Sequence, residues 1–124
     1  MIKGIGIDIV SIPSLSQKLE TTSFIEKVFT PQEIQDCRGH KQNLERFAGK
    51  FAAKESFMKA IGKGIRQEIW FLQIEVLNNE FGAPFISLSG KADKYFNELI
   101  NGKIHLSISH TKSTAVAVVI IESE

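Results

Sequence analysis

The stretch FAGKFAAKESFMKAIGKG, residues 47–64, carries the strongest pattern in this sequence. Its large apolar side chains recur at separations of four, seven and three residues, which is typical of one buried side of a helix: Phe47, Phe51, Met58 and Ile61. Gly62 and Gly64 predict the end of this helix, because glycine readily adopts the left-handed conformation that closes helices.

A second row of this helix holds Glu55 and, four residues later, Lys59. Ala48 and Ala52 lie in the same row, and their small side chains leave room for a group as large as a phosphate to reach the carboxylate. An amphipathic core helix with a solvated Glu55–Lys59 pair would show the same pattern. The stretch alone therefore leaves a functional site and a purely structural helix both open.

The composition predicts one folded domain spanning residues 1–124. With 43% hydrophobic residues, a chain of this length can bury roughly two thirds of the surface that it exposes when unfolded. Its 15 basic and 14 acidic residues give a net charge of +1, which provides no general argument for binding nucleic acid or membranes. The single Cys37 excludes an internal disulfide and is expected to be a small apolar filler. No apolar run is long enough to span a bilayer, so we expect a cytoplasmic protein.

The amino-terminal residues Ile2–Val10 alternate as a strand does. Ile5, Ile7 and Ile9 share one face, and Gly4, Gly6 and Asp8 share the other. Aspartate is disfavoured inside strands, and the two glycines leave space on its face for a ligand or for a second backbone. An edge strand whose polar face meets water is the alternative.

The remaining patterns predict an α+β fold. Helices are expected over residues 12–19, 24–29, 31–61 with an interruption near Gly39, and 91–100. Thr30-Pro31-Gln32-Glu33 supplies an N-cap, a first-turn proline and an acidic third residue for one of these helices. Strands are expected over residues 70–77, 84–88, 104–109 and 114–121. This order fits a single antiparallel-rich sheet with helices packed on one face.

The turn after residue 108 gathers hydroxyl, imidazole and ammonium groups that suit phosphate oxygens: Ser109, His110, Thr111, Lys112 and Ser113. Taken singly, it is only a polar hairpin turn. Asp8 and Glu55, two carboxylates on separate elements, add chemistry that suits magnesium, which prefers oxygen ligands and keeps several waters. Cysteine or paired histidine ligands for zinc are not apparent.

Three motifs of this sequence resemble those of the 4′-phosphopantetheinyl transferases. They are GIGIDIV at residues 4–10, FAAKESFMKA at residues 51–60 followed by Gly62, and SISHT at residues 107–111. The short chain, with its first motif at the start, is similar to the holo-acyl-carrier-protein synthase branch. The resemblance covers essentially the whole length.

The resemblance implies transfer of phosphopantetheine from coenzyme A to a serine of apo acyl carrier protein, for fatty acid biosynthesis. It implies that Asp8 and Glu55 bind magnesium and that Asp8, Glu55 and Lys59 are catalytic. The residues expected to contact the phosphates of coenzyme A are Lys50, Lys54, Lys59, Ser109, His110 and Thr111. The resemblance also implies a homotrimer with sites between subunits. The carboxy-terminal strand, Thr114–Ile121, is apolar on both faces and is expected to contribute to the subunit contact.

The chain also departs from the pattern of that family. Lys50 stands where many relatives have arginine, and Lys63 where they often have threonine. The first helix has few basic residues, so docking of the acidic carrier protein is expected to use apolar and basic residues together: Ile12, Leu15, Leu19, Lys18 and Lys27.

The sequence does not decide whether Glu55 or a water held by Asp8 or Glu55 accepts the serine proton. Two other classes of function use the same residues. A magnesium-dependent nucleotide hydrolase would use the same carboxylates and lysines but transfer to water. A non-catalytic module would present Lys50, Lys54, Lys59 and Lys63 as a solvated basic face.

Overall fold

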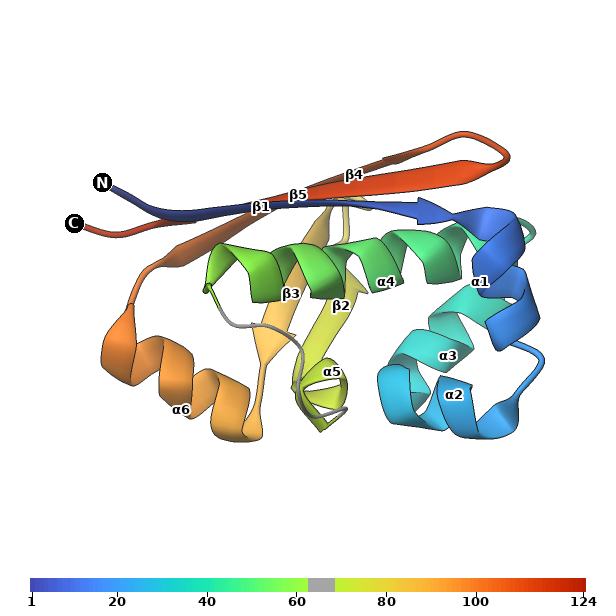
Figure 1. Cartoon of the computed structure of the whole chain (residues 1–124), viewed down its shortest axis with the longest axis horizontal. Helices are drawn as coiled ribbons and strands as arrows, with labels where there is room; N and C mark the ends of the chain where they lie inside the picture. The colour runs from blue at the N-terminus through green and yellow to red at the C-terminus, as the bar shows by residue number, and fades with distance from the viewer. Residues whose placement is uncertain (63–68) are drawn as a thin grey trace.

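A three-stranded antiparallel sheet carries the long helix α4 (Asn43–Ala60) on one of its faces (Figure 1). The structure is a computed structural model that describes residues 1–62 and 69–124. The sheet consists of β1 (Ile2–Ser11), β5 (Thr114–Glu122) and β4 (Lys103–His110), with β5 in the centre. The alternate residues of β5 that face α4 are fully buried: Ala115, Ala117, Val119 and Ile121.

The glycines of β1 let the helix approach the strand closely. A Cβ atom at Gly4 would run into the carbonyl group of Ala60, and one at Gly6 into the carbonyl group of Ser56. Of the two possibilities for this face, the neighbour at Gly4 and Gly6 is therefore a second backbone. Asp8 follows on the same face of the strand and is brought next to α4.

Three short helices connect β1 to α4: α1 (Ile12–Lys18), α2 (Thr22–Val28) and α3 (Pro31–Arg38). The capping box predicted at Thr30 is confirmed, because Thr30 Oγ1 accepts from Glu33 N while Thr30 N donates to Glu33 Oε1. The predicted break near Gly39 separates α3 from α4. Gly62 has a φ of 77° just after α4, as expected for a glycine that closes a helix.

The segment after residue 68 differs from its prediction. Residues 70–73 belong to the short helix α5 (Ile69–Gln73), and strand β2 begins only at Ile74 and ends at Asn78. The carbonyl oxygens of Phe71 and Ile74 both accept hydrogen bonds from Lys54 Nζ, at 2.7 Å each. Carbonyls three residues apart converge on one donor in a helical turn but alternate in direction along a strand, so the buried ammonium favours the helix.

Strand β2 pairs with β3 (Pro84–Leu88), and helix α6 (Gly90–Leu99) leads from β3 to β4. The α+β class and both hairpins are confirmed, but the single sheet is wrong: β2 and β3 form a separate two-stranded sheet. Alternation of side chains predicts which face of a strand is buried, but not which other strand it bonds to. Here β3 packs close to β4 without joining its ladder.

The other face of the three-stranded sheet carries no helix from the described residues (Figure 1). In β1 its side chains are well exposed, at 63% for Ile5, 59% for Ile7 and 71% for Ile9. Their cross-strand partners on β5 are also apolar: Ile120, Val118 and Val116. We refer to these six residues as the open apolar face.

Candidate active site

Strand β1 and helix α4 bring together the three residues predicted to be catalytic. Lys59 Nζ lies 3.0 Å from Asp8 Oδ1 and donates a second hydrogen bond to the carbonyl oxygen of Ile7 at 3.1 Å. Glu55 lies one helical turn before Lys59 and neighbours the Asp8 carboxyl. The alternation of β1 and the i, i+4 spacing of α4 thus direct all three side chains to one place.

Glu55 is the residue whose chemistry this arrangement alters most. Burial, followed by the neighbouring carboxyl of Asp8, raises the pKa of Glu55 from 4.5 to about 7, while the charges of Lys59 and Lys18 act in the opposite direction. A carboxyl group with a pKa near 7 can accept and release a proton at neutral pH. It is also a place where an additional positive charge would be stabilising.

The carboxylate pair offers oxygen atoms to a metal ion. Asp8 Oδ2 is enclosed by protein and has no hydrogen-bond partner, whereas Oδ1 is paired with Lys59. In residues 1–62 and 69–124 no group of three or more His, Cys, Asp or Glu side chains could hold a metal. Two carboxylates with room for waters and phosphate oxygens suit magnesium better than zinc.

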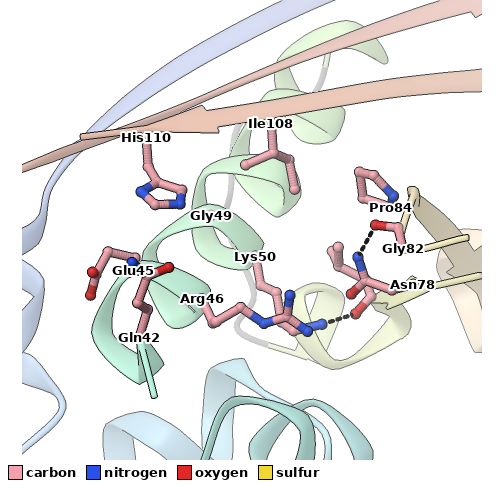
Figure 2. Close-up of a pocket in the computed structure, with 11 residues that line it drawn as sticks. Gln42, Glu45, Arg46, Gly49, Lys50, Asn78, Gly82, Pro84, Ile108 and His110 are labelled. Atoms are coloured by element: carbon pink, nitrogen blue, oxygen red, sulfur yellow. Dashed lines mark hydrogen bonds between the residues drawn. The ribbon is translucent and has the colours of Figure 1, made fainter. Parts of the chain in front are cut away.

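A pocket of about 180 Å³ lies beside the first half of α4, between that helix, β4 and the β2–β3 hairpin (Figure 2). Its polar and charged lining residues are Gln42, Glu45, Arg46, Lys50, Asn78 and His110. Of these, Lys50 and His110 were predicted to bind coenzyme A. Arg46 was missed, although its i, i+4 spacing with Lys50 on α4 could have indicated it.

Lys54 does not have the role predicted for it. Its side chain is fully buried, and Nζ donates to Glu33 Oε1 at 2.8 Å in addition to the two carbonyls of α5 and β2. Burial lowers the pKa of Lys54, and the charge and hydrogen bond of Glu33 act in the opposite direction. An ammonium group with three protein partners and no exposure cannot also contact a phosphate, so Lys54 is a structural residue.

Lys50 is nearly as enclosed, with 4% of its surface exposed. Its Nζ donates to the carbonyl oxygen of Val76 at 2.6 Å and lies 3.9 Å from Asp36 Oδ2. These partners take up much of the hydrogen-bonding capacity of the Lys50 ammonium group. The solvated basic face considered above is also wrong for Lys50 and Lys54, and Lys63 lies outside the described residues.

The residues of the 107–111 motif are not all brought together. His110 lines the pocket, whereas Ser109 follows the opposite alternation of β4 and is exposed on the face away from α4. Thr111 Oγ1 accepts hydrogen bonds from the backbone amides of Ser113 and Thr114 and thereby shapes the turn. Of this motif, Ile108 and His110 line the pocket, and His110 is the polar one of the two.

The carboxylate pair and the pocket lie on opposite sides of α4. Arg46 precedes Glu55 by nine residues, and Lys50 precedes Lys59 by nine. Nine residues are two and a half helical turns, which turn a side chain to the opposite face. The first site faces β1 and the second faces β4 and the β2–β3 hairpin.

Two further sequence predictions are settled by burial. Cys37 is buried, and desolvation raises the pKa of its thiol to about 12, which confirms an unreactive apolar filler.

Ile12 and Leu15 were expected to be docking contacts, but they are 4% and 3% exposed and belong to the core. On α1, Lys18 remains exposed, with Nζ 6.0 Å from the centre of the Phe24 ring.

Residues 4–119 match the family model of the 4′-phosphopantetheinyl transferase superfamily, and the chain belongs to that superfamily. Within it, the similar proteins are holo-[acyl-carrier-protein] synthases. That of Geotalea daltonii is 41% identical over 98% of this chain and 99% of its own, and that of Clostridium novyi is 46% identical over 98% and 88%.

Solved structures of the same group agree with the fold. The holo-(acyl-carrier-protein) synthase of Bacillus anthracis in complex with CoA (3′,5′-ADP) has a TM-score of 0.83 and 40% identity, covering 100% of this chain and 99% of the other. The synthase of Neisseria meningitidis has a TM-score of 0.90 and 32% identity, covering 99% and 100%.

Proposed function

We propose that this protein transfers the 4′-phosphopantetheine group from coenzyme A to a serine of apo acyl carrier protein. The products are holo acyl carrier protein, for fatty acid biosynthesis, and adenosine 3′,5′-bisphosphate. The observation that carries the proposal is the Asp8–Glu55–Lys59 arrangement, in a chain similar over its whole length to holo-[acyl-carrier-protein] synthases.

Asp8 and Glu55 are the residues that would hold a magnesium ion. The enclosed Asp8 Oδ2 lacks a partner, and the pKa of Glu55 is raised first by burial and then by the neighbouring carboxyl of Asp8. When bound, magnesium would neutralise charge on the diphosphate and help to position it.

The protein's own groups have distinct tasks in this reaction. The serine oxygen forms a bond to the phosphorus that carries pantetheine, and the bond from that phosphorus to the oxygen bridging to adenosine bisphosphate breaks. We assign the serine proton to Glu55, the carboxyl group that lies one helical turn from Lys59 and beside Asp8. Lys59 holds the Asp8 carboxylate in place and leaves more than half of its own side chain exposed to contact a phosphate oxygen.

A homotrimer with sites between subunits is part of the proposal. One extended coenzyme would have to pass around α4 to reach both the carboxylate pair and the pocket of a single chain. The pocket of a neighbouring subunit, brought next to the pair, would remove this difficulty. The open apolar face supports such a contact, since an uncovered patch of this kind is typical of an interaction surface.

The proposed compartment is the cytoplasm. The free thiol of Cys37 suits a reducing environment. None of the helices in the described part of the chain combines the length and apolar character needed to cross a membrane.

Mass spectrometry of apo acyl carrier protein incubated with the protein, coenzyme A and magnesium tests the proposed reaction. The carrier should gain the mass of phosphopantetheine, and adenosine 3′,5′-bisphosphate should appear in equal amount. Hydrolysis of coenzyme A without modification of the carrier would instead indicate a nucleotide hydrolase. An unchanged carrier and unchanged coenzyme would overturn both enzymatic functions.

A further inference from the structure

The ion pair between Lys59 and Asp8 involves a carboxylate that the proposed function also assigns to a metal ion. Lys59 Nζ lies 3.0 Å from Asp8 Oδ1, and its second hydrogen bond goes to the carbonyl oxygen of Ile7 at 3.1 Å. Within residues 1–62 and 69–124, these two acceptors are the polar partners of the Lys59 ammonium group. A metal ion at Asp8 and Glu55 would therefore bring a second cation to a carboxylate that already has one.

Of the two members of this pair, Lys59 is the one that can move. Its side chain is 57% exposed, whereas that of Asp8 is 11% exposed. Asp8 lies within β1 and is paired with Ala117 of the central strand, so its backbone is fixed by the sheet. The ammonium group of a lysine is carried on a flexible four-carbon stem, and an exposed ion pair is weak, so turning Lys59 away from Asp8 costs little.

Two cations on the same carboxylate oxygen repel each other. Magnesium binds its oxygen ligands at about 2.0–2.1 Å, and Oδ1 of Asp8 is already the acceptor of Lys59. Under the proposed function, on which this inference rests, the diphosphate of coenzyme A reacts at this same place and brings negatively charged oxygens. An ammonium group that leaves Asp8 thus has a stronger acceptor within reach than the carbonyl oxygen of Ile7.

We propose that Lys59 exchanges partners when the substrate binds: it occupies Asp8 until a metal ion binds there, and its ammonium group then contacts a phosphate oxygen of coenzyme A. The exchange makes the metal and the coenzyme bind cooperatively. The metal frees Lys59 for the coenzyme, and by the reciprocity of coupled binding the coenzyme favours the metal to the same extent. In the alternative arrangement, Lys59 stays on Oδ1 while the metal uses the enclosed Oδ2.

The first half of the exchange is tested with manganese ions alone, without coenzyme. Manganese prefers the same oxygen ligands as magnesium, and electron paramagnetic resonance measures the free ion. Lys59→Met removes the competing cation and should bind manganese at least about threefold more tightly than the unmodified protein. The alternative arrangement predicts unchanged or weaker binding, because Lys59 would then support the carboxylate that holds the metal.

Lys18→Met is the matched control for a general effect of charge. The charge of Lys18 also acts on Glu55, but Lys18 is exposed and is not paired with Asp8. It removes the same charge in the same way and should change manganese affinity by less than about twofold. An equal gain in Lys18→Met and Lys59→Met would overturn the exchange, because the field of any nearby cation would then explain the result.

The second half of the exchange is tested by calorimetric titration with coenzyme A. In magnesium buffer, Lys59→Met should bind coenzyme A at least about fivefold more weakly than the unmodified protein. With EDTA in place of magnesium, the difference should be less than about twofold, because Lys59 of the unmodified protein then remains on Asp8. An equal loss in both buffers would overturn the exchange, since it indicates a lysine that contacts phosphate whether or not the metal is bound.

Circular dichroism establishes that each variant is folded, and Lys59→Gln repeats both titrations if Lys59→Met is not. Unchanged or weaker manganese binding by a folded Lys59 variant would overturn the proposal. Failure of the proposed function has a different signature: the unmodified protein would bind no coenzyme A and leave the carrier unmodified. The coenzyme half of the exchange would then fail with it, whereas the manganese comparison would still decide whether Lys59 competes for Asp8.

Discussion

The replacement Lys54→Met is the sharpest test of which lysines of α4 stabilise the fold and which belong to the candidate active site. The ammonium group of Lys54 has no exposure and three partners at 2.7–2.8 Å. Methionine has a similar length and an apolar end, so it fills the space and removes the charge and the hydrogen bonds. The Glu33 carboxylate, which is also fully buried, loses its cation.

The expected cost is large because Glu33 keeps only part of its support. Its oxygens still accept from the backbone amides of Thr30 and Val76. Removing one partner of a buried ion pair typically destabilises by about 3–5 kcal/mol. This is a large share of the roughly 5–15 kcal/mol that stabilises an ordinary domain, and it corresponds to a fall of about 10–20 °C in melting temperature.

Urea unfolding followed by circular dichroism, at one fixed protein concentration, measures this cost. The variant Lys59→Met serves as the control, because 57% of the Lys59 side chain is exposed and its pair with Asp8 should contribute less than the fully buried Lys54–Glu33 pair. Adding Glu33→Gln to Lys54→Met should restore roughly 1–3 kcal/mol, since the unpaired charge is removed as well.

A different outcome would refute the structural assignment of Lys54. If Lys54→Met changes the unfolding midpoint no more than Lys59→Met but abolishes binding of coenzyme A, the ammonium group contacts the ligand. The predicted pattern is the reverse: Lys54→Met lowers stability, and Lys59→Met lowers activity with little change in stability.

Three further predictions concern the carboxylate pair and the open apolar face. Asp8→Asn and Glu55→Gln should each keep the fold and lose most magnesium affinity in calorimetric titrations with coenzyme A present; unchanged affinity in both would remove the ligand assignment. Because the pKa of Glu55 is raised to about 7 in the folded protein, the folded state holds its proton more tightly than the unfolded chain does. The unmodified protein should therefore lose stability relative to Glu55→Gln as pH rises from about 4.5 to about 7. The expected loss is about 1–2 kcal/mol, because solvent screens the charge at this half-buried site. Parallel pH profiles of stability for the two proteins would contradict this. Light scattering should give three times the chain mass of 13.8 kDa for the unmodified protein and a smaller mass for Ile7→Lys, whose charge lies in the middle of the open apolar face; a 13.8 kDa species before mutation would reject the trimer.

The sequence predicted most of the elements, because alternation and helical spacing report directly on burial. It predicted the closing glycine of α4, the capping box at Thr30 and the two hairpins. It placed α5 in a strand because Trp70–Gln73 alternates as well as a strand does. The partner that decides this segment, the ammonium group of Lys54, comes from a helix that is distant in sequence.

Contacts between residues distant in sequence also explain why some site residues were predicted wrongly. Asp8, Glu55 and Lys59 follow from periodicity within two elements, which the structure packs together. Sequence spacing cannot distinguish Lys54, which is buried against Glu33, from Lys59, which pairs with Asp8 and stays largely exposed, since both lie on the same helix. The burial of a lysine depends on which carbonyl groups the remote hairpin presents to it. Arg46 was missed for the complementary reason, because the hairpin that closes its pocket follows some thirty residues later along the chain.

Two side-chain atoms in the described part of the chain are enclosed by protein and have no hydrogen-bond partner: Asp8 Oδ2 and Arg46 Nε. Buried polar atoms are nearly always satisfied, as Glu33 and Lys54 are here, so two exceptions call for a reason. One exception is an acceptor beside a second carboxylate, and it would be satisfied by a cation. The other is a charged donor beside a histidine, and it would be satisfied by an anion. Under the proposed function both would be supplied, the cation by magnesium and the anion by a phosphate of coenzyme A. The unmet hydrogen-bonding capacity thus lies at the two places where the proposed substrate is expected, on opposite sides of one helix.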